Sequence, residues 1–242
     1  VHYEPIKNVN IRSYNPQIVT NLDNVEMAAK LISQSKRPVI YVGGGAINSG
    51  AWQEVRELAR KTNFPVTTTL LAKGTMDETD PNSLGMLGMH GTAYANFAVR
   101  DCDLLINIGA RFDDRVTGKI DSWATGAKII HIDIDPAELG KVYRPDVGLN
   151  GDCKVILQAL IPLVEERGRT EWNEQVARWK EEFPLWYPDS KDQVYPQMVC
   201  DEIFNVTGSE AIISTGVGQH QMWAAQFYKC KHPRTFVTSG GL

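Results

Sequence analysis

Apolar runs and helical spacings alternate along the chain between residues 21 and 154. A helical spacing at 23–35 precedes a continuous apolar run at 37–42, a glycine turn and a second helical stretch at 51–61. Further strands are predicted at 64–70, 103–110, 127–135 and 147–152, and further helices at 91–102, 153–167 and from Pro136 onward. Because apolar strands alternate with helices, we expect a doubly wound, mainly parallel α/β sheet with helices on both faces.

The pattern changes after Arg167. Residues 170–190 are polar and rich in tryptophan, and the spacing of Trp172, Val176 and Trp179 predicts a surface helix that runs into a linker broken by proline. A helix at 194–207 and a strand, glycine turn and helix at 210–227 then predict the opening of a second α/β unit. The chain begins without Met and ends in "VTSGGL", so we interpret it as a piece of a longer protein, and we expect the segment after Tyr195 to be disordered or prone to aggregate.

Composition excludes several classes of protein. The 242 residues carry a net charge of -4 without a run of Lys or Arg, which disfavours a nucleic-acid partner. No apolar run approaches the roughly 18 residues of a membrane span, and the start lacks the layout of a signal peptide. The four cysteines have no metal-ligand spacing, so free thiols in a reducing compartment are predicted.

The glycine turn at 41–50 joins a strand to a helix, an arrangement that lets backbone N–H groups approach a phosphate. Gly43 and Gly45 match the first two glycines of the dinucleotide fingerprint, but the third position is Asn48. The acid expected at the end of the next strand is also missing, so an NAD site is disfavoured. The turn is either a tight connection or a nucleotide contact of another kind.

Charged side chains follow the strand at 103–110. Arg111 and Arg115 suit a pyrophosphate, and Asp113 and Asp114 suit sugar hydroxyls, although the same residues could only brace the loop. Asp133 and Asp135 stand at the end of the strand at 127–135, where an acid can accept a hydroxyl or an adenine amine, although Asp135 before Pro136 fits a helix cap better. Because no third acid stands near them, no metal site is predicted.

Two more segments offer ligand contacts. Glycines at 85–91 leave backbone open to a flat ligand, with Met89 as an apolar surface; His90 is either a ligand contact or a core histidine. The turn after the strand near residue 213 offers backbone to a second phosphate, with Gln219 and His220 as side-chain donors.

Four strings identify a family. "GMLGMHGTAYANFAV", "GARFDDRVTGK", "KIIHIDIDPAE" and "ISTGVGQHQMWAAQFY" resemble the large catalytic subunit of acetohydroxyacid synthase, also called acetolactate synthase. The resemblance covers nearly the whole chain and is thinnest between residues 167 and 195. It implies an enzyme that joins two 2-keto acids, pyruvate with pyruvate or 2-ketobutyrate, with loss of CO₂, in branched-chain amino-acid biosynthesis. Thiamine diphosphate, Mg²⁺ and a structural FAD would be its cofactors.

The resemblance also implies domains and sites. Residues 1–20 would link to a missing N-terminal domain, 21–166 would bind FAD, 167–194 would form a linker and surface helix, and 195–242 would begin the thiamine-diphosphate domain. The implied FAD contacts are Gly44, Thr69, Leu70, Leu87, Gly88, Met89, His90, Gly109, Ala110, Arg111, Phe112, Asp113, Asp133, Ile134, Asp152 and Cys153. Gln219 and His220 would reach the diphosphate, and Asp114 and Arg115 would line the substrate channel.

The family works as a homodimer or homotetramer, with a possible regulatory subunit, in the bacterial cytoplasm or the plastid stroma. No catalytic residue or metal ligand of the family falls in this chain, so we expect it to be inactive alone. Two alternatives stay open: another thiamine-diphosphate carboligase or decarboxylase, and a non-catalytic nucleotide-binding module.

Overall fold

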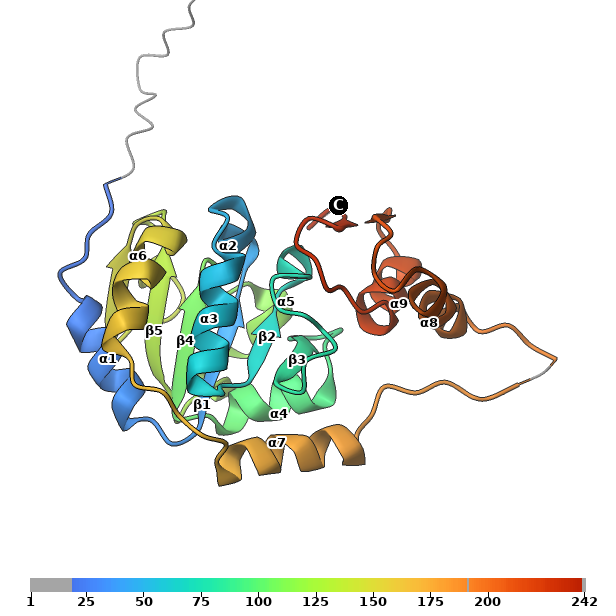
Figure 1. Ribbon diagram of the computed structural model, residues 1–242, viewed down its shortest axis with the longest axis horizontal. Coiled ribbons are helices and arrows are strands. Elements are labelled where there is room, and N and C mark those ends of the chain that lie inside the picture. The colour runs from blue at the N-terminus through green and yellow to red at the C-terminus, as the bar shows by residue number, and fades with distance from the viewer. Residues whose placement is uncertain (1–18, 191, 241–242) are drawn as a thin grey trace, which may run out of the picture.

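A six-stranded parallel sheet forms the centre of the molecule (Figure 1). The computed structural model describes residues 19–190 and 192–240, so most of the predicted linker at 1–20 lies outside the described residues. The strands stand in the order β3-β2-β1-β4-β5-β6 and every neighbouring pair is parallel. Their bounds are β1 (Pro38–Val42), β2 (Val66–Thr68), β3 (Ser83–Met86), β4 (Leu104–Ile108), β5 (Lys128–Asp133) and β6 (Val147–Asn150).

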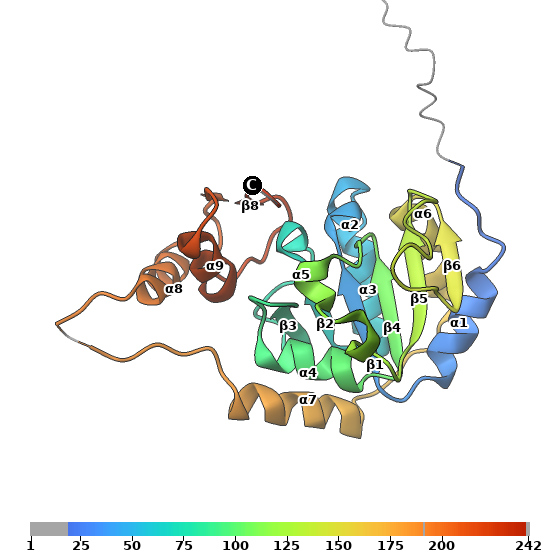
Figure 2. The ribbon, with the colours of Figure 1, turned by 180° about the vertical axis from the view of Figure 1, so that it is seen from behind.

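Two hydrophobic cores lie on the two faces of this sheet. On one face pack α1 (Val25–Gln34), α3 (Trp52–Thr62) and α6 (Cys153–Leu160), which lie in front of the sheet in Figure 1. The core of the other face includes buried residues of α4 (Ala93–Asp101) and α7 (Glu171–Glu182), and the reverse view shows α7 beside α4 at the lower end of the sheet (Figure 2). Every residue of β1 and β4 is buried, because both faces are covered. The doubly wound parallel fold is therefore confirmed.

Short helices complete the connections. They are α2 (Gly44–Asn48), η1 (Leu70–Ala72), α5 (Asp114–Thr117), η2 (Ile120–Ser122) and η3 (Ile161–Leu163). The predicted helix at 153–167 ends as an α-helix at Leu160, because Pro162 lacks the N–H that would continue it.

Three sequence expectations need correction. β3 lies in the glycine-rich stretch where no strand was predicted. The residues from Pro136 form turns rather than a helix, and Asp135 accepts the N–H of Ala137 to start them. The helix at 171–182 is only partly a surface helix, since Trp172 and Val176 are buried against the second core.

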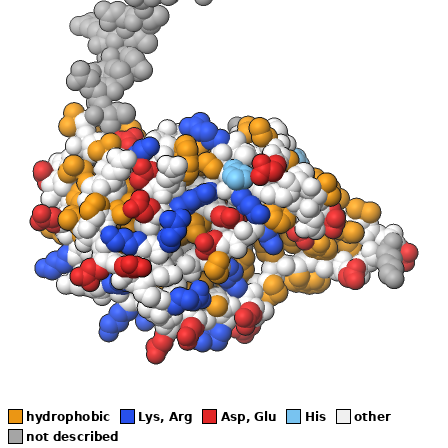
Figure 3. All heavy atoms as spheres, viewed as in Figure 1, with side chains coloured by type: hydrophobic (Ala, Val, Ile, Leu, Met, Phe, Trp, Pro, Cys, Tyr) orange, Lys and Arg blue, Asp and Glu red, His pale blue; other side chains and the backbone are white. Residues whose placement is uncertain are grey.

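The C-terminal unit consists of α8 (Pro196–Thr207), β7 (Ile213–Ser214), α9 (Gln219–Phe227) and β8 (Phe236–Val237). The predicted strand, glycine turn and helix are present, and β7 pairs in parallel with β8, a strand that the sequence did not reveal. α8 has no buried residue, and Val206 is 83% exposed. We call the six-stranded sheet and the helices that cover it the sheet unit. The face seen in Figure 3 carries interspersed acidic and basic side chains over this unit.

Candidate functional site

The carboxyl ends of the six strands form one continuous edge. Five backbone N–H groups directly after the strands donate to the last or last-but-one carbonyls of the neighbouring strands: Leu87 to Thr68 (3.2 Å), Thr69 to Val42 (2.9 Å), Gly43 to Ile108 (2.9 Å), Gly109 to Ile132 (2.8 Å) and Gly151 to Asp133 (2.9 Å). These bonds extend the pairing one step beyond the strands and place the residues side by side. Most of the predicted FAD contacts stand in this row or within four residues of it.

The first glycine turn is packed against the end of β4, at the point where the strand order reverses. A Cβ on Gly43 would stand 2.2 Å from the carbonyl oxygen of Gly109, and one on Gly45 would stand 2.9 Å from the Gly109 Cα. The N–H of Gly45 donates to that same oxygen at 2.9 Å. Gly43 and Gly45 therefore serve close packing, and the half-buried Gly44 is the glycine of this turn predicted as a ligand contact.

The loops after β3 and β4 lie against each other. The N–H of Met89 donates to the carbonyl of Arg115 at 2.9 Å, and a Cβ on Gly88 would meet the same carbonyl oxygen at 2.7 Å. Gly88 has φ +102°, a conformation that favours glycine. The Asn96 side-chain amide donates to the Gly88 carbonyl at 3.1 Å. Two segments that the sequence predicted as ligand contacts are thus brought together.

The charged loop after β4 is mostly exposed. Asp113 caps α5, and its carboxylate accepts the backbone N–H of Arg115 at 3.1 Å. This bond is the main reason that the pKa of Asp113 lies below its usual value, and the nearby Arg111 guanidinium adds to the effect. Arg111 approaches Asp113 only to 3.8 Å and its side chain is 69% exposed, so bracing leaves most of its hydrogen-bonding capacity free.

Burial divides the predicted contacts into three groups. The exposed ones are Met89, His90, Arg111, Asp113, Asp114, Arg115 and Ile134; the half-buried ones are Gly44, Thr69, Leu70, Gly109 and Asp152; the buried ones are Leu87, Gly88, Ala110, Phe112, Asp133 and Cys153. His90 is therefore not a core histidine. Phe112 packs edge-on against His131, Trp123 and Tyr143 and supports the loop from beneath.

Two carboxylates hold backbone at the other end of the edge. Asp133 accepts the N–H of Asp135 at 2.9 Å, and its second oxygen lies 3.7 Å from the buried His131 ring. Asp152 caps α6 and accepts the N–H groups of Lys154 and Val155. Each has a structural partner, which leaves its remaining lone pairs for a ligand.

Two residues at this edge, Thr68 and Leu71, were not predicted as contacts from the sequence. The hydroxyls of Thr68 and Thr69 are buried without a partner among the described residues, although only Thr69 was predicted as a contact. Leu71 is 50% exposed beside the first glycine turn, where it would meet a Cβ on Gly44 at 3.2 Å. The run "TTTLL" after the apolar start of β2 is the signal that could have extended the prediction to both.

The second glycine turn has a different setting. Gly216 and Gly218 are exposed, and so are Gln219 and His220 in the first turn of α9. The free N–H groups of a helix start favour an anion. The two predicted diphosphate contacts therefore stand at an open helix terminus.

A cleft of about 1090 Å³ lies at the opposite edge of the sheet, where Pro38 begins β1 and Pro65 precedes β2. Its arginines are already engaged: for example, Arg100 pairs with Asp101, and Arg167 donates to the carbonyls of Ile32, Ser33 and Ser35. Ligands of open parallel sheets bind at the carboxyl edge, so we place the site there and not in this cleft.

Among residues 19–190 and 192–240, no three His, Cys, Asp or Glu side chains are grouped to hold a metal ion. No helix in the described part of the chain is long and apolar enough to cross a membrane.

Comparison with known proteins gives two family matches. Residues 25–160 match the thiamine pyrophosphate enzyme central domain, and residues 216–242 match the thiamine pyrophosphate enzyme C-terminal TPP binding domain. The first match covers more than half of the chain and spans the sheet from α1 to α6.

Similar curated proteins carry one function in their names. The chain is 47% identical over 237 residues to the acetolactate synthase large subunit of Cyanidium caldarium, covering 95% of this chain and 40% of that protein. It is 49% identical over 226 residues to the chloroplastic acetolactate synthase 1 of Zea mays, covering 90% and 35%. The large subunit of Parasynechococcus marenigrum is 49% identical over 222 residues, covering 90% and 36%.

These matches confirm the resemblance predicted from the sequence. The chain spans 35% to 40% of the length of these relatives. It belongs to the thiamine pyrophosphate enzyme family and contains that family's central domain.

Proposed function

We propose that this chain is the flavin-binding part of an acetolactate synthase. The observation that carries the proposal is the row of backbone and side chains along the carboxyl edge of the sheet, in a chain nearly half identical to acetolactate synthase large subunits. The whole protein would join two 2-keto acids, pyruvate with pyruvate or with 2-ketobutyrate, and release CO₂. Thiamine diphosphate supplies the carbanion chemistry of this reaction, and FAD has a structural role.

The residues at the carboxyl edge fit FAD in their chemistry. Met89 and Ile134 are 65% and 46% exposed, so apolar side chains are available to a flavin or adenine ring. Arg111 stands on the same edge with a guanidinium fork suited to a pyrophosphate. The unpartnered hydroxyls of Thr68 and Thr69 would gain partners from a polar ligand. An elongated ligand with apolar ends and a charged middle satisfies all three groups.

The other residues predicted from the sequence take the roles that the family implies. Gln219 and His220 would hold the diphosphate at the start of α9, with Mg²⁺ and further contacts supplied by segments outside this chain. Asp114 and Arg115 would face the substrate channel. We also propose the division into a central domain at 21–166, a linker and helix at 167–194 and a diphosphate-binding unit at 195–242. A homodimer or homotetramer with a regulatory subunit, in the bacterial cytoplasm or plastid stroma, belongs to the same proposal.

Flavin fluorescence tests this proposal. Titration of the chain into FAD is expected to change the flavin fluorescence and to saturate at one binding site per chain, because the flavin ring leaves water for an apolar surface. The intact protein is expected to form acetolactate from pyruvate when thiamine diphosphate and Mg²⁺ are added. Absence of binding by both chain and intact protein would overturn the flavin assignment, and absence of acetolactate would overturn the reaction.

A further inference from the structure

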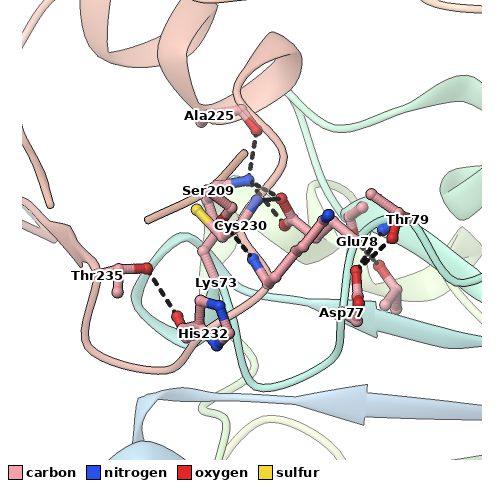
Figure 4. A network of polar contacts seen from close by, with 12 residues as sticks. Lys73, Asp77, Glu78, Thr79, Ser209, Ala225, Cys230, His232 and Thr235 are labelled. Carbon is pink, nitrogen blue, oxygen red and sulfur yellow. Dashed lines mark hydrogen bonds and ion pairs between the residues drawn. The ribbon is translucent and has the colours of Figure 1, made fainter. Parts of the chain in front are cut away.

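A buried ion pair joins the sheet unit to the C-terminal unit. Lys73 and Glu78 both belong to the connection between β2 and β3, and their side chains are 1% and 6% exposed. The Lys73 ammonium donates to both carboxylate oxygens of Glu78 at 2.7 Å and to the carbonyl of Ala225 at 2.8 Å (Figure 4). These three bonds use all three ammonium protons.

The pair holds the end of α9 and the segment after it. Ala225 lies in the last turn of α9, where a cation is favourable because the helix dipole is negative there. The Glu78 carboxylate also accepts the backbone N–H of Cys230 at 2.8 Å, and the Glu78 N–H donates to the Cys230 carbonyl at 3.0 Å. One buried pair therefore fixes two points of the C-terminal unit.

A second contact ties the same helix to the candidate flavin edge. The Gln226 side chain donates to the carbonyl of His90 at 2.8 Å, in the loop after β3. α9 has nine residues, which corresponds to a length of about 13 Å. Its last turn is held by the sheet unit, while its first turn presents Gln219 and His220 to solvent.

The adjoining backbone is equally close. A Cβ on Gly74 would stand 2.0 Å from the carbonyl oxygen of His232, so the two units meet backbone against backbone. Arg56 of α3 donates to the carbonyls of Gly74 and Thr75 in one unit and of Lys231 in the other. These contacts leave the C-terminal unit little freedom to shift along the surface of the sheet unit.

Stability alone is a weak reason for such a pair. Desolvation of two charges offsets most of their attraction, and apolar replacements of similar volume are often as stable. The hydrogen bonds from this pair are directional, and those to Ala225 and Cys230 fix the position of the C-terminal unit. A position-setting role explains why charged groups stand where apolar ones would pack.

We propose that Lys73 and Glu78 are positioning residues that set the place of Gln219 and His220 relative to the flavin edge. Through α9 they hold the diphosphate-binding turn at a fixed distance from the loop that contains His90. This inference rests on the proposed function, because it takes the start of α9 to be the diphosphate site.

The test uses the intact protein with three variants: Glu78→Gln, Lys73→Met, and Lys73→Met combined with Glu78→Leu. Calorimetry with Mg²⁺ measures the affinity for thiamine diphosphate, flavin fluorescence measures the affinity for FAD, and hydrogen exchange follows residues 219–230. Each single variant is expected to bind thiamine diphosphate at least about ten-fold more weakly and to exchange faster in α9. FAD affinity should stay within about two-fold, since the flavin edge is intact.

The double variant separates positioning from stability. It removes the unpaired buried charge, so its melting temperature should recover, but its diphosphate affinity should stay low. The inference would be overturned if the double variant recovered both its melting temperature and its affinity for thiamine diphosphate. It would also be overturned if Glu78→Gln, and every other variant that folds, bound thiamine diphosphate as tightly as the wild type. The matched control is Lys141→Met, which breaks the pair of the exposed Lys141 with Glu138 (2.6 Å) and should change neither affinity.

The two proposals can fail separately. A wild-type protein that binds thiamine diphosphate but forms no acetolactate would overturn the proposed reaction and leave the positioning role measurable by binding. If the wild-type protein forms acetolactate but the variants keep their affinity for thiamine diphosphate, the proposed reaction stands and the positioning role of Lys73 and Glu78 is overturned.

Discussion

Two strand–glycine turn–helix units stand in one chain, and they are built differently. After β1, Gly43 is buried and its N–H donates to Ile108 at 2.9 Å. After β7, Gly216 is exposed, and its nearest neighbour would be the His220 ring at 3.4 Å from an added Cβ. The same local pattern thus serves backbone packing in one unit and leaves the helix start open in the other.

The neighbouring strand accounts for this difference. β1 lies between β2 and β4, so the turn that leaves it meets the end of β4 at once. β7 has only the two-residue β8 as a partner among the described residues, and nothing in that part of the chain closes over its turn. A glycine turn therefore indicates a phosphate site only when its surroundings leave the N–H groups free.

The largest effect is expected from Gly43→Ala. An added Cβ would stand 2.2 Å from the Gly109 oxygen and 2.3 Å from the Ala110 Cα, so backbone must move. We expect the free energy of unfolding, measured by urea denaturation, to fall by at least about 3 kcal/mol. Gly216→Ala is the matched control and should change it by less than about 1 kcal/mol. Similar losses for the two variants would contradict the contrast between the turns.

Arg56→Met is expected to loosen the contact between the two units. Arg56 donates to three backbone carbonyls, one of them on Lys231 in the C-terminal unit. Loss of these bonds should lower the free energy of local opening of the C-terminal unit by about 2 kcal/mol. Hydrogen exchange should therefore be faster at 228–237, while the central strands keep their protection. Arg60→Met on the exposed side of the same helix is the control. Equal exchange in both variants would show that Arg56 does not hold the units together.

Arg111→Ala should weaken FAD binding about ten-fold, or by about 1.4 kcal/mol. Because its ion pair with Asp113 is long and exposed, the free energy of unfolding should change by less than about 0.5 kcal/mol. Arg144→Ala, an exposed arginine before β6, provides a control of equal charge at the other edge. A titration that gives the same FAD affinity for both variants would remove Arg111 from the site.

The thiols give the smallest effect at neutral pH. Burial raises the pKa of Cys102, Cys153 and Cys230 to about 12, and raises that of the half-buried Cys200 of α8 as well. At pH 8 we expect a maleimide to label Cys200 first. Since the raised pKa favours the neutral thiol of the folded state, its stabilising effect is complete below about pH 9 and is lost as the pH rises towards 12. Early labelling of Cys102 would contradict the packing of the second core.

Much of the sheet was predictable from local pattern. β1 is a continuous apolar run and β4 and β5 are mostly apolar, because both faces of a parallel sheet are covered, and the helices that cover them have clear apolar spacing. β3 has no such signal: its four residues include Gly85 at φ +67°, and its pairing with β2 is irregular. The turn after Pro136 imitates a helix start, since Asp135 makes the same kind of cap in both.

The candidate site was predictable in location and not in detail. The residues after each strand could be placed at one edge because parallel strands share their carboxyl ends. The closure of the first glycine turn by Gly109 depends on a contact between residues more than 60 positions apart, which no local pattern encodes. The pair of Lys73 and Glu78 was missed for the same reason, because its partners Ala225 and Cys230 lie about 150 residues further along the chain.

The central claim is that FAD binds along the carboxyl edge of the sheet. Hydrogen exchange of the chain with and without saturating FAD tests it directly, because the two edges contain different peptides. We expect added protection at 87–90, 109–113 and 133–134, and none at 35–37 and 101–103 beside the cleft of about 1090 Å³ at the other edge. Protection confined to the peptides beside that cleft, or equal at the two edges, would contradict the account.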